Sequence, residues 1–172
     1  MKPHSLPKVI LSAMEPEDLD MLYRIENDTQ LWDVGSTNVP YSRYTLHDFI
    51  AHSSNDIYAD RQVRLIVEDG QGNALGLVDL MNYDPSHNRA EVGIVIMQPA
   101  RHQGYGRAAM EALHHYASSI LHLHQIYAIV AATGVDTRSL FCNIGYQETA
   151  VMPDWLFDGH EYLDAVMLQK IL

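Results

Sequence analysis

A short segment near the middle of the chain holds the residues best suited to chemistry. Residues 101–107 read RHQGYGR and follow an apolar, β-branched run at residues 92–97. After the segment, apolar residues recur at helical spacing from Ala109 to Ile120. Glycine lets backbone N–H groups approach a ligand, and a helix start offers unpartnered donors and a positive dipole end. The pattern predicts a phosphate-binding loop between a strand and a helix, with a plain connecting turn as the alternative.

The phosphate ligand is not a dinucleotide. Residues 104–109 match the spacing GxGxxA nominally, but that fingerprint needs an acidic residue about 20 residues further on, after the next strand. The next predicted strand, residues 125–132, contains no acid. A P-loop is excluded as well, because no Gly-Lys-Ser/Thr sequence ends the segment.

The elements that must position this loop follow from the periodicity of the chain. We expect a strand at 8–14, a helix from Glu15 to about Asn27, and a second helix at 45–53 with Thr45 at its start. Strands are predicted at 62–68, 74–83 and 89–98, followed by the helix after Gly104 and a strand at 125–132. A helix at 136–143, with Gly145 as its left-handed cap, precedes a hairpin of 146–152 and 162–172. The order predicts an α+β fold, a mixed, mostly antiparallel sheet of about seven strands flanked by about four helices.

The loop resembles motif A of the GNAT acetyltransferase superfamily, whose pattern is Gln/Arg-x-x-Gly-x-Gly/Ala. The order of elements agrees with that superfamily over roughly residues 8–172, and so does Ile144-Gly145-Tyr146 after the last helix. Within it, the chain is similar to the spermidine and ribosomal-protein N-terminal acetyltransferase branch. That similarity rests on the loop, on residues 89–91 (RAE), and on residues 155–159 (WLFDG) with Tyr162 and Asp164.

The resemblance implies one GNAT domain over residues 1–172 that uses acetyl-CoA as co-substrate and no metal. It implies that the backbone of Ile94, Val95 and Ile96 binds the pantetheine arm. It places the phosphates on the loop and helix start, at Arg101, His102, Gln103, Gly104, Tyr105, Gly106, Arg107 and Ala108.

Acetyl transfer requires a neutral amine, and an alkylamine with a pKa near 10 is mostly protonated at neutral pH. Glu91 is the candidate base, because it is an acid within an otherwise apolar strand; the alternative is an ion pair with Arg89 or Arg64. Phe141 stands where the superfamily often has a tyrosine acid. Tyr146, Tyr162 and Cys142 are the candidate replacements. Nothing in the sequence chooses among them, and Tyr146 is taken as the catalytic candidate.

Three aromatic residues, Trp32, Tyr41 and Trp155, are expected to wall the acceptor pocket, with ordinary loop packing as the alternative. The chain is thus expected to move an acetyl group to a primary amine of a polyamine, a peptide N-terminus or a small molecule. The rival hypothesis, motivated by Phe141, is a non-catalytic protein that binds acyl-CoA.

Net charge and composition restrict the classes of molecule that we expect the chain to bind. The net charge of −11 argues against nucleic acid, which needs clustered Lys and Arg, and is compatible with a cationic amine. The apolar runs fall short of the roughly 20 residues of a membrane helix, and Ser12 and Glu15 interrupt the N-terminal apolar stretch. We therefore expect a cytoplasmic protein without a membrane partner. Because the superfamily commonly dimerises, the resemblance implies a homodimer as a further expectation.

Overall fold

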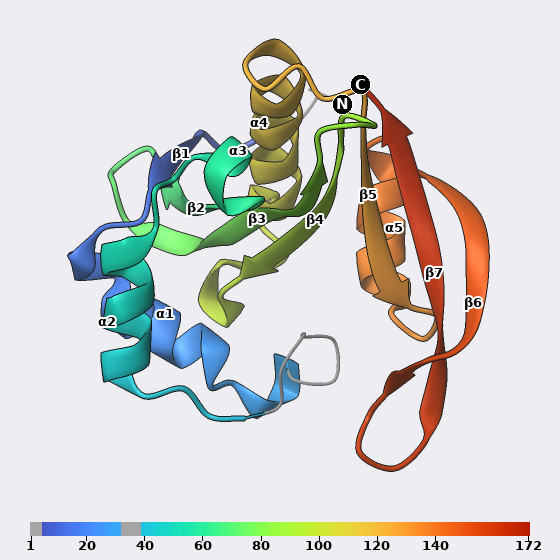
Figure 1. The fold of residues 1–172 in the computed structure, drawn as a ribbon, viewed down its shortest axis with the longest axis horizontal. Helices are drawn as coiled ribbons and strands as arrows, with labels where there is room; N and C mark the ends of the chain where they lie inside the picture. The colour runs from blue at the N-terminus through green and yellow to red at the C-terminus, as the bar shows by residue number, and fades with distance from the viewer. Residues whose placement is uncertain (1–4, 32–38) are drawn as a thin grey trace.

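The computed structural model describes residues 5–31 and 39–172. In chain order the elements are β1 (Val9–Ala13), α1 (Leu19–Glu26), α2 (Arg43–His52), α3 (Ile57–Asp60), β2 (Val63–Asp69), β3 (Ala74–Asp84), β4 (Arg89–Ile96), α4 (Tyr105–Ser119), β5 (Gln125–Ala131), α5 (Val135–Asn143), β6 (Gln147–Phe157) and β7 (Tyr162–Ile171). The predicted order of strands and long helices is confirmed (Figure 1). None of the helices in this part of the chain is long and apolar enough to cross a bilayer.

Seven strands form one sheet in the order β1-β2-β3-β4-β5-β7-β6. Every neighbouring pair is antiparallel except β4 and β5, which are the two strands joined by the crossover through α4. Their parallel pairing spans only three residue pairs, from Arg89 and Gln125 to Glu91 and Tyr127. Beyond that point the two strands diverge, as Figure 1 shows, while β4 stays paired with β3 and β5 with β7.

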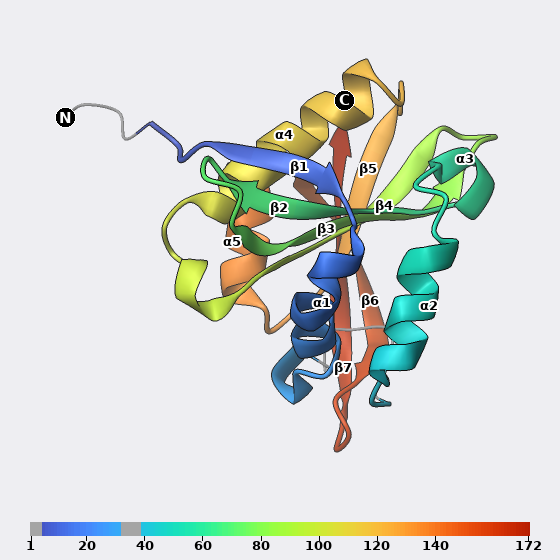
Figure 2. The ribbon, with the colours of Figure 1, turned by 90° about the vertical axis from the view of Figure 1, so that its left-hand side faces the viewer.

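The two faces of the sheet are covered by different helices. The main core lies under α4 and α5 and includes Met110, Leu113 and Phe141 together with Ala90 and Val92 of β4. A second core lies under α1 and α2, where Val95 of β4 packs. Figure 2 shows the helices on their two sides of the sheet. Because side chains alternate along a strand, Glu91 and Gly93 share the α1–α2 face with Val95.

Several predicted boundaries are wrong for identifiable reasons. Helix α2 begins at Arg43 rather than Thr45, because Ser42 is the cap: its Oγ accepts from the Thr45 amide at 3.0 Å. Strand β4 ends at Ile96, where a 3-10 turn over Gln98–Ala100 takes over. The one-turn helix α3 was not predicted, since it is a single turn started by the Asp56 side chain accepting from the Tyr58 amide.

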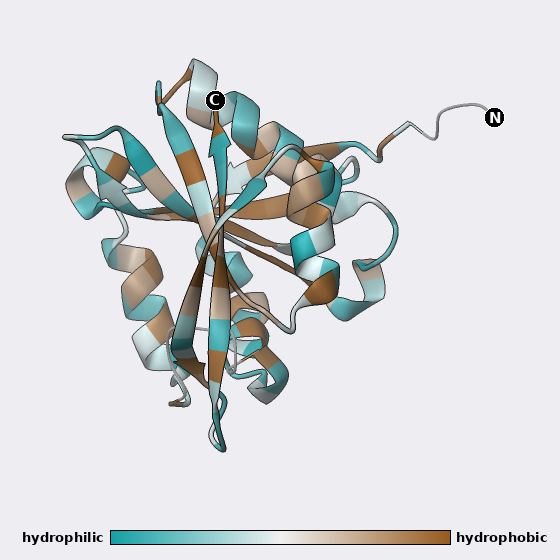
Figure 3. Cartoon of the chain, turned by 90° about the vertical axis from the view of Figure 1, so that its right-hand side faces the viewer, coloured by the Kyte–Doolittle hydropathy of each residue, from teal (hydrophilic) through white to brown (hydrophobic). Residues whose placement is uncertain are grey.

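The C-terminal hairpin is longer than predicted. Strand β6 continues past Pro153 to Phe157, because the register shifts between Met152 and Leu156 and leaves Pro153 outside the regular ladder. In Figure 3 the hairpin has brown and teal segments and a teal tip, which agrees with the sequence DGHE at residues 158–161. The predicted left-handed Gly145 after α5 is confirmed, with φ of 96°.

Candidate active site

The edge of β4 that faces β5 carries backbone groups outside the sheet ladder. The Met97 amide donates to the Leu75 carbonyl across β3 at 2.8 Å. Since backbone groups alternate between the two edges of an antiparallel strand, Val95 faces β3, whereas Ile94 and Ile96 face the side of β5. The Ile96 carbonyl accepts a 2.7 Å hydrogen bond from Nε of Arg101, which places the start of the loop beside this edge. Of the three residues expected to bind pantetheine, Ile94 and Ile96 thus face the divergence.

The glycine loop leads directly into the N-terminus of α4. Gly104 is the N-cap with φ of 87°, and the first helical bond is the Ala108 amide donating to the Gly104 carbonyl at 3.0 Å. The amides of Tyr105, Gly106 and Arg107 precede that bond, so they have no partner one turn back. A Cβ on Gly104 would lie 3.2 Å from Cδ of Pro7, so close packing as well as the positive φ favours glycine.

The side chains of the loop have varied positions. His102 is exposed with φ of 60°, and Gln103 donates to the Pro99 carbonyl at 2.8 Å. Arg107 pairs with Glu111 one turn further along α4, Nε to Oε1 at 2.9 Å, and Ala108 is buried. The loop therefore offers a ligand its backbone N–H groups and the guanidinium groups of Arg101 and Arg107, each of which is already bonded through Nε. It does not form a cage of side chains.

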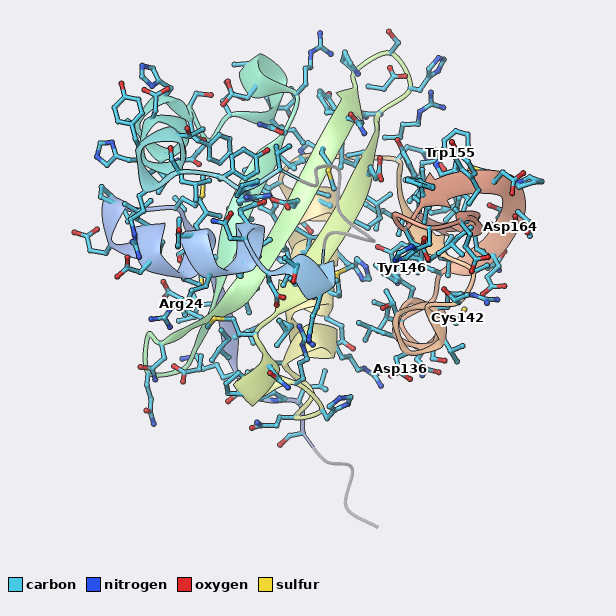
Figure 4. The ribbon with its side chains drawn as sticks, turned by 90° about the horizontal axis from the view of Figure 1, so that it is seen from below. Arg24, Asp136, Cys142, Tyr146, Trp155 and Asp164 are labelled. Atoms are coloured by element: carbon cyan, nitrogen blue, oxygen red, sulfur yellow. The ribbon has the colours of Figure 1, made fainter. Side chains whose placement is uncertain are left out.

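A cavity of about 90 Å³ lies between α1 and the loop. Its lining includes Arg24, Asp28, Val95, Gln98 and Arg101. Figure 4 shows Arg24 on α1, on the opposite side of the molecule from the β6–β7 hairpin. Two arginines thus line one hollow next to the predicted phosphate loop.

Glu91 occupies the last residue pair before β4 and β5 diverge, opposite Tyr127. Its Oε2 accepts a 2.8 Å hydrogen bond from Nδ2 of Asn82 on β3. The alternative reading, an ion pair with Arg89 or Arg64, does not describe the structure: Arg89 pairs with Asp84 at 3.1 Å, and Arg64 has other carboxylate partners. A carboxylate held by a neutral amide therefore stands at the point of divergence.

A half-buried network of ion pairs joins β2, β3 and α1. Arg64 binds Asp79 through two hydrogen bonds of 2.7 and 2.9 Å and Glu26 of α1 through one of 2.5 Å. Burial alone would lower the pKa of Arg64, but the two adjacent carboxylates outweigh burial and raise that pKa. The network links α1 to β2 and β3, so it fixes the helix that covers the face of Glu91.

Tyr146 lies in the main core, on the other face of the sheet from Glu91. Its side chain is 3% exposed and its ring packs edge-on against Phe141, with the centroids 4.8 Å apart. Its hydroxyl is 3.1 Å from Nε2 of His114 on α4, and burial raises the pKa of Tyr146. The structure does not bring the two predicted catalytic residues together.

Two of the three predicted acceptor residues can be placed. Tyr41 packs against the core under α1 and α2, and Trp155 is 57% exposed on the bulged part of β6. Figure 4 shows Trp155 and Asp164 together on the hairpin side of the molecule. Trp32 falls outside the described residues.

Two asparagines that hold the site were missed by the sequence reasoning. Asn27 clamps the Tyr41 backbone, accepting from its amide at 2.8 Å and donating to its carbonyl at 3.1 Å. Asn82 binds Glu91. A lone asparagine gives no periodic signal, so only its tertiary contact reveals the role.

Comparison with known proteins agrees with this geometry. Residues 8–147 match the family model described as an acetyltransferase (GNAT) domain, which is most of the chain. The chain belongs to the GNAT acetyltransferase family. As a family member it is an acetyl-CoA-dependent N-acetyltransferase.

Individual relatives are similar over nearly their whole length. The spermidine N(1)-acetyltransferase of Vibrio cholerae is 26% identical over 157 residues, covering 91% of this chain and 89% of that protein. The enzyme of the same name from Escherichia coli is 24% identical, covering 95% and 86%. A crystal structure of spermidine N-acetyltransferase from Vibrio cholerae in complex with CoA and spermine superposes with a TM-score of 0.85 at 26% identity, covering 95% of each chain. The predicted GNAT fold and acetyl-CoA co-substrate are confirmed, and the non-catalytic alternative receives no support.

Proposed function

We propose that this acetyltransferase acts on a primary amine of a polyamine such as spermidine. The observation that carries the proposal is the similarity to spermidine acetyltransferases across 91–95% of the chain. The acidic character of the protein, with a net charge of −11, supports it, because a polyamine is a flexible polycation.

In the proposed reaction, Glu91 accepts a proton from the substrate ammonium group, directly or through one water. The freed lone pair of the nitrogen attacks the thioester carbonyl of acetyl-CoA, forming the C–N bond as the C–S bond breaks. The acylated nitrogen then loses its second proton to the departing thiolate or to water, which gives the neutral amide and CoA. A carboxylate suits this role because it both attracts the cationic amine and takes its proton. Its place beside the divergence of β4 and β5 supports the assignment.

The remaining steps need no side-chain acid. The backbone N–H groups on the free edge of β4, near Ile94, are suited to polarising the thioester carbonyl. The leaving thiol has an ordinary pKa near 8.5, so it departs as a thiolate near neutral pH. This accounts for Phe141 at the position where the superfamily often has tyrosine.

The co-substrate is proposed to lie along the divergence and on the loop. The backbone edge at Ile94 and Ile96 takes the pantetheine amides, and the amides and guanidinium groups from Arg101 to Ala108 take the phosphates. The helix N-terminus and the positive dipole end of α4 support this placement. Tyr41, Trp155 and Trp32 remain the proposed walls of the acceptor pocket.

The test compares Glu91→Gln with the wild-type protein. We expect kcat for spermidine acetylation to fall about 10²-fold or more, with the acetyl-CoA dissociation constant unchanged within about twofold. Glu17→Gln is the matched control, because Glu17 is exposed on the turn before α1. Full activity of Glu91→Gln would rule out Glu91 as the base. Loss of acetyl-CoA binding in that variant would instead assign Glu91 to the co-substrate site.

Three further expectations stay predictions: a cytoplasmic location, the absence of nucleic-acid and membrane partners, and a homodimer. Net charge supports the second, since counterion release from nucleic acid requires clustered cations.

A further inference from the structure

Strand β3 is interrupted directly opposite the candidate base. Met81 pairs with Glu91 and Asp84 pairs with Arg89, so two residues of β3, Asn82 and Tyr83, face one residue of β4. This is a β-bulge, and Asn82 adopts the left-handed conformation with φ of 52°. Asparagine tolerates that conformation better than most residues.

The bulge changes the direction of two side chains. In a regular strand Tyr83 would share a face with Met81 and therefore with Glu91. Instead Tyr83 is buried in the main core under α4, 7% exposed and packed edge-on against Tyr58. The extra residue turns Asn82 toward the other face, where its Nδ2 lies 2.8 Å from Oε2 of Glu91.

The Asn82 amide that donates to Glu91 is neutral, and this matters because the base must attract a cation. An amide hydrogen bond orients a carboxylate and stabilises its charged form without cancelling its charge. Two arginines of the neighbouring strand positions have other carboxylate partners: Arg89 pairs with Asp84, and Arg64 pairs with Asp79 and Glu26. One oxygen of Glu91 is held, and the negative charge stays available to an ammonium group.

We propose that Asn82 is a positioning residue for the acetyl transfer: the β3 bulge holds its amide on Oε2 of Glu91, so that the other carboxylate oxygen faces the substrate amine. This inference rests on the proposed function of Glu91. The bulge in β3 thus places a neutral hydrogen-bond donor beside the base.

Other titratable groups surround Glu91, and any measured pH dependence includes them. Tyr127 faces it from β5, and burial together with the Glu91 charge raises the pKa of Tyr127. The charged groups of this part of the sheet include Arg89, Asp84, Arg64 and Asp79, and those of the covering helix α1 are Asp20, Arg24 and Glu26. Substitution of Asn82 alters none of these side chains, so wild type and variants are compared with the same set of charged groups.

Two substitutions at Asn82 separate the hydrogen bond from the backbone conformation. Asn82→Gly keeps the left-handed φ and removes the amide, while Asn82→Asp keeps the shape and places a negative charge against Glu91. Asn55→Asp is the matched control, because Asn55 has φ of 54° and its side chain meets Ser53 instead. The readouts are the pH profile of kcat/KM for spermidine and the ¹³C titration of the Glu91 carboxyl, assigned with Glu91→Gln.

We expect Asn82→Gly to lower kcat about tenfold with an unchanged KM for acetyl-CoA, since general-base catalysis contributes 10²–10⁴-fold in total. Asn82→Asp should move the acidic limb of the profile and the Glu91 titration midpoint about one pH unit or more upward, as adjacent like charges do. Asn55→Asp should leave both in place. An unchanged limb and midpoint in Asn82→Asp, with an active wild type, would overturn the role of Asn82 alone. A wild type that acetylates no amine would instead overturn the proposed function, and the role of Asn82 with it.

Discussion

Acidification should destabilise this protein through one histidine, His114. Nε2 of part-buried His114, on α4, lies 3.1 Å from the Tyr146 hydroxyl. In the neutral tautomer that carries its proton on Nδ1, Nε2 accepts a hydrogen bond from that hydroxyl. Burial, and then the positive charge of Lys170, lower the pKa of His114 to about 4, partly opposed by Glu111. Protonation would turn Nε2 into a donor and leave the buried Tyr146 hydroxyl proton without its acceptor.

The sign and size of the effect follow from the two states. Between pH 6.5 and about 4, the unfolded chain binds a proton at His114 that the folded chain does not, so the free energy of unfolding falls as pH falls. The lowering from 6.5 to about 4, at about 1.4 kcal/mol per pH unit, sets an upper bound of about 3.5 kcal/mol. Because the side chain is only part-buried, we expect about 2 kcal/mol.

Urea unfolding at a series of pH values measures this term. His114→Gln retains a hydrogen-bonding group without a titrating ring, so the difference between wild type and variant isolates the histidine. The wild type should lose about 2 kcal/mol relative to His114→Gln between pH 7 and pH 4.5. His115→Gln, an exposed neighbour on the same helix, is the control and should titrate like the wild type. A difference that stays constant with pH would refute the buried neutral state of His114.

Three further predictions address the other structural groups. Arg64→Met removes the cation of a half-buried network, so the free energy of unfolding measured in urea melts should fall by about 3 kcal/mol. The exposed Arg43→Met should lower the same free energy by less than about 1 kcal/mol. Gly104→Ala should weaken CoA binding about tenfold in calorimetry, because the positive φ and Pro7 contact distort the loop; Gly72→Ala, with φ of 85° and open space, should share the backbone strain but keep affinity. Tyr146→Phe should lower stability by about 1 kcal/mol and leave kcat within about twofold, since its hydroxyl serves the core; a large loss of kcat alone would restore its predicted catalytic role.

The sequence predicted the fold well where local patterns determine it. The glycine loop before α4 and the left-handed Gly145 follow from backbone geometry that few other residues adopt, and both are where they were expected. The start of α2 was misplaced by two residues because Ser42 and Thr45 are both of a type that caps helices. Only the three-dimensional structure shows which hydroxyl meets the amide.

The candidate site was less predictable, because its contacts join distant segments. Tyr146 and His114 are 32 positions apart, and their hydrogen bond gives a buried role to a residue predicted to be catalytic. The bulge that brings Asn82 to Glu91 has no sequence signature beyond an asparagine in a strand. Periodicity placed Glu91 on the correct strand, but the partner of its carboxylate is a property of the tertiary fold.

The most direct test of the account is mass spectrometry of spermidine incubated with the protein and acetyl-CoA, with free thiol release followed in the same reaction. We expect mono-acetylated spermidine and one thiol released per product, both abolished when acetyl-CoA is replaced by CoA. Unmodified spermidine, in a sample that binds acetyl-CoA by calorimetry, would contradict the polyamine assignment.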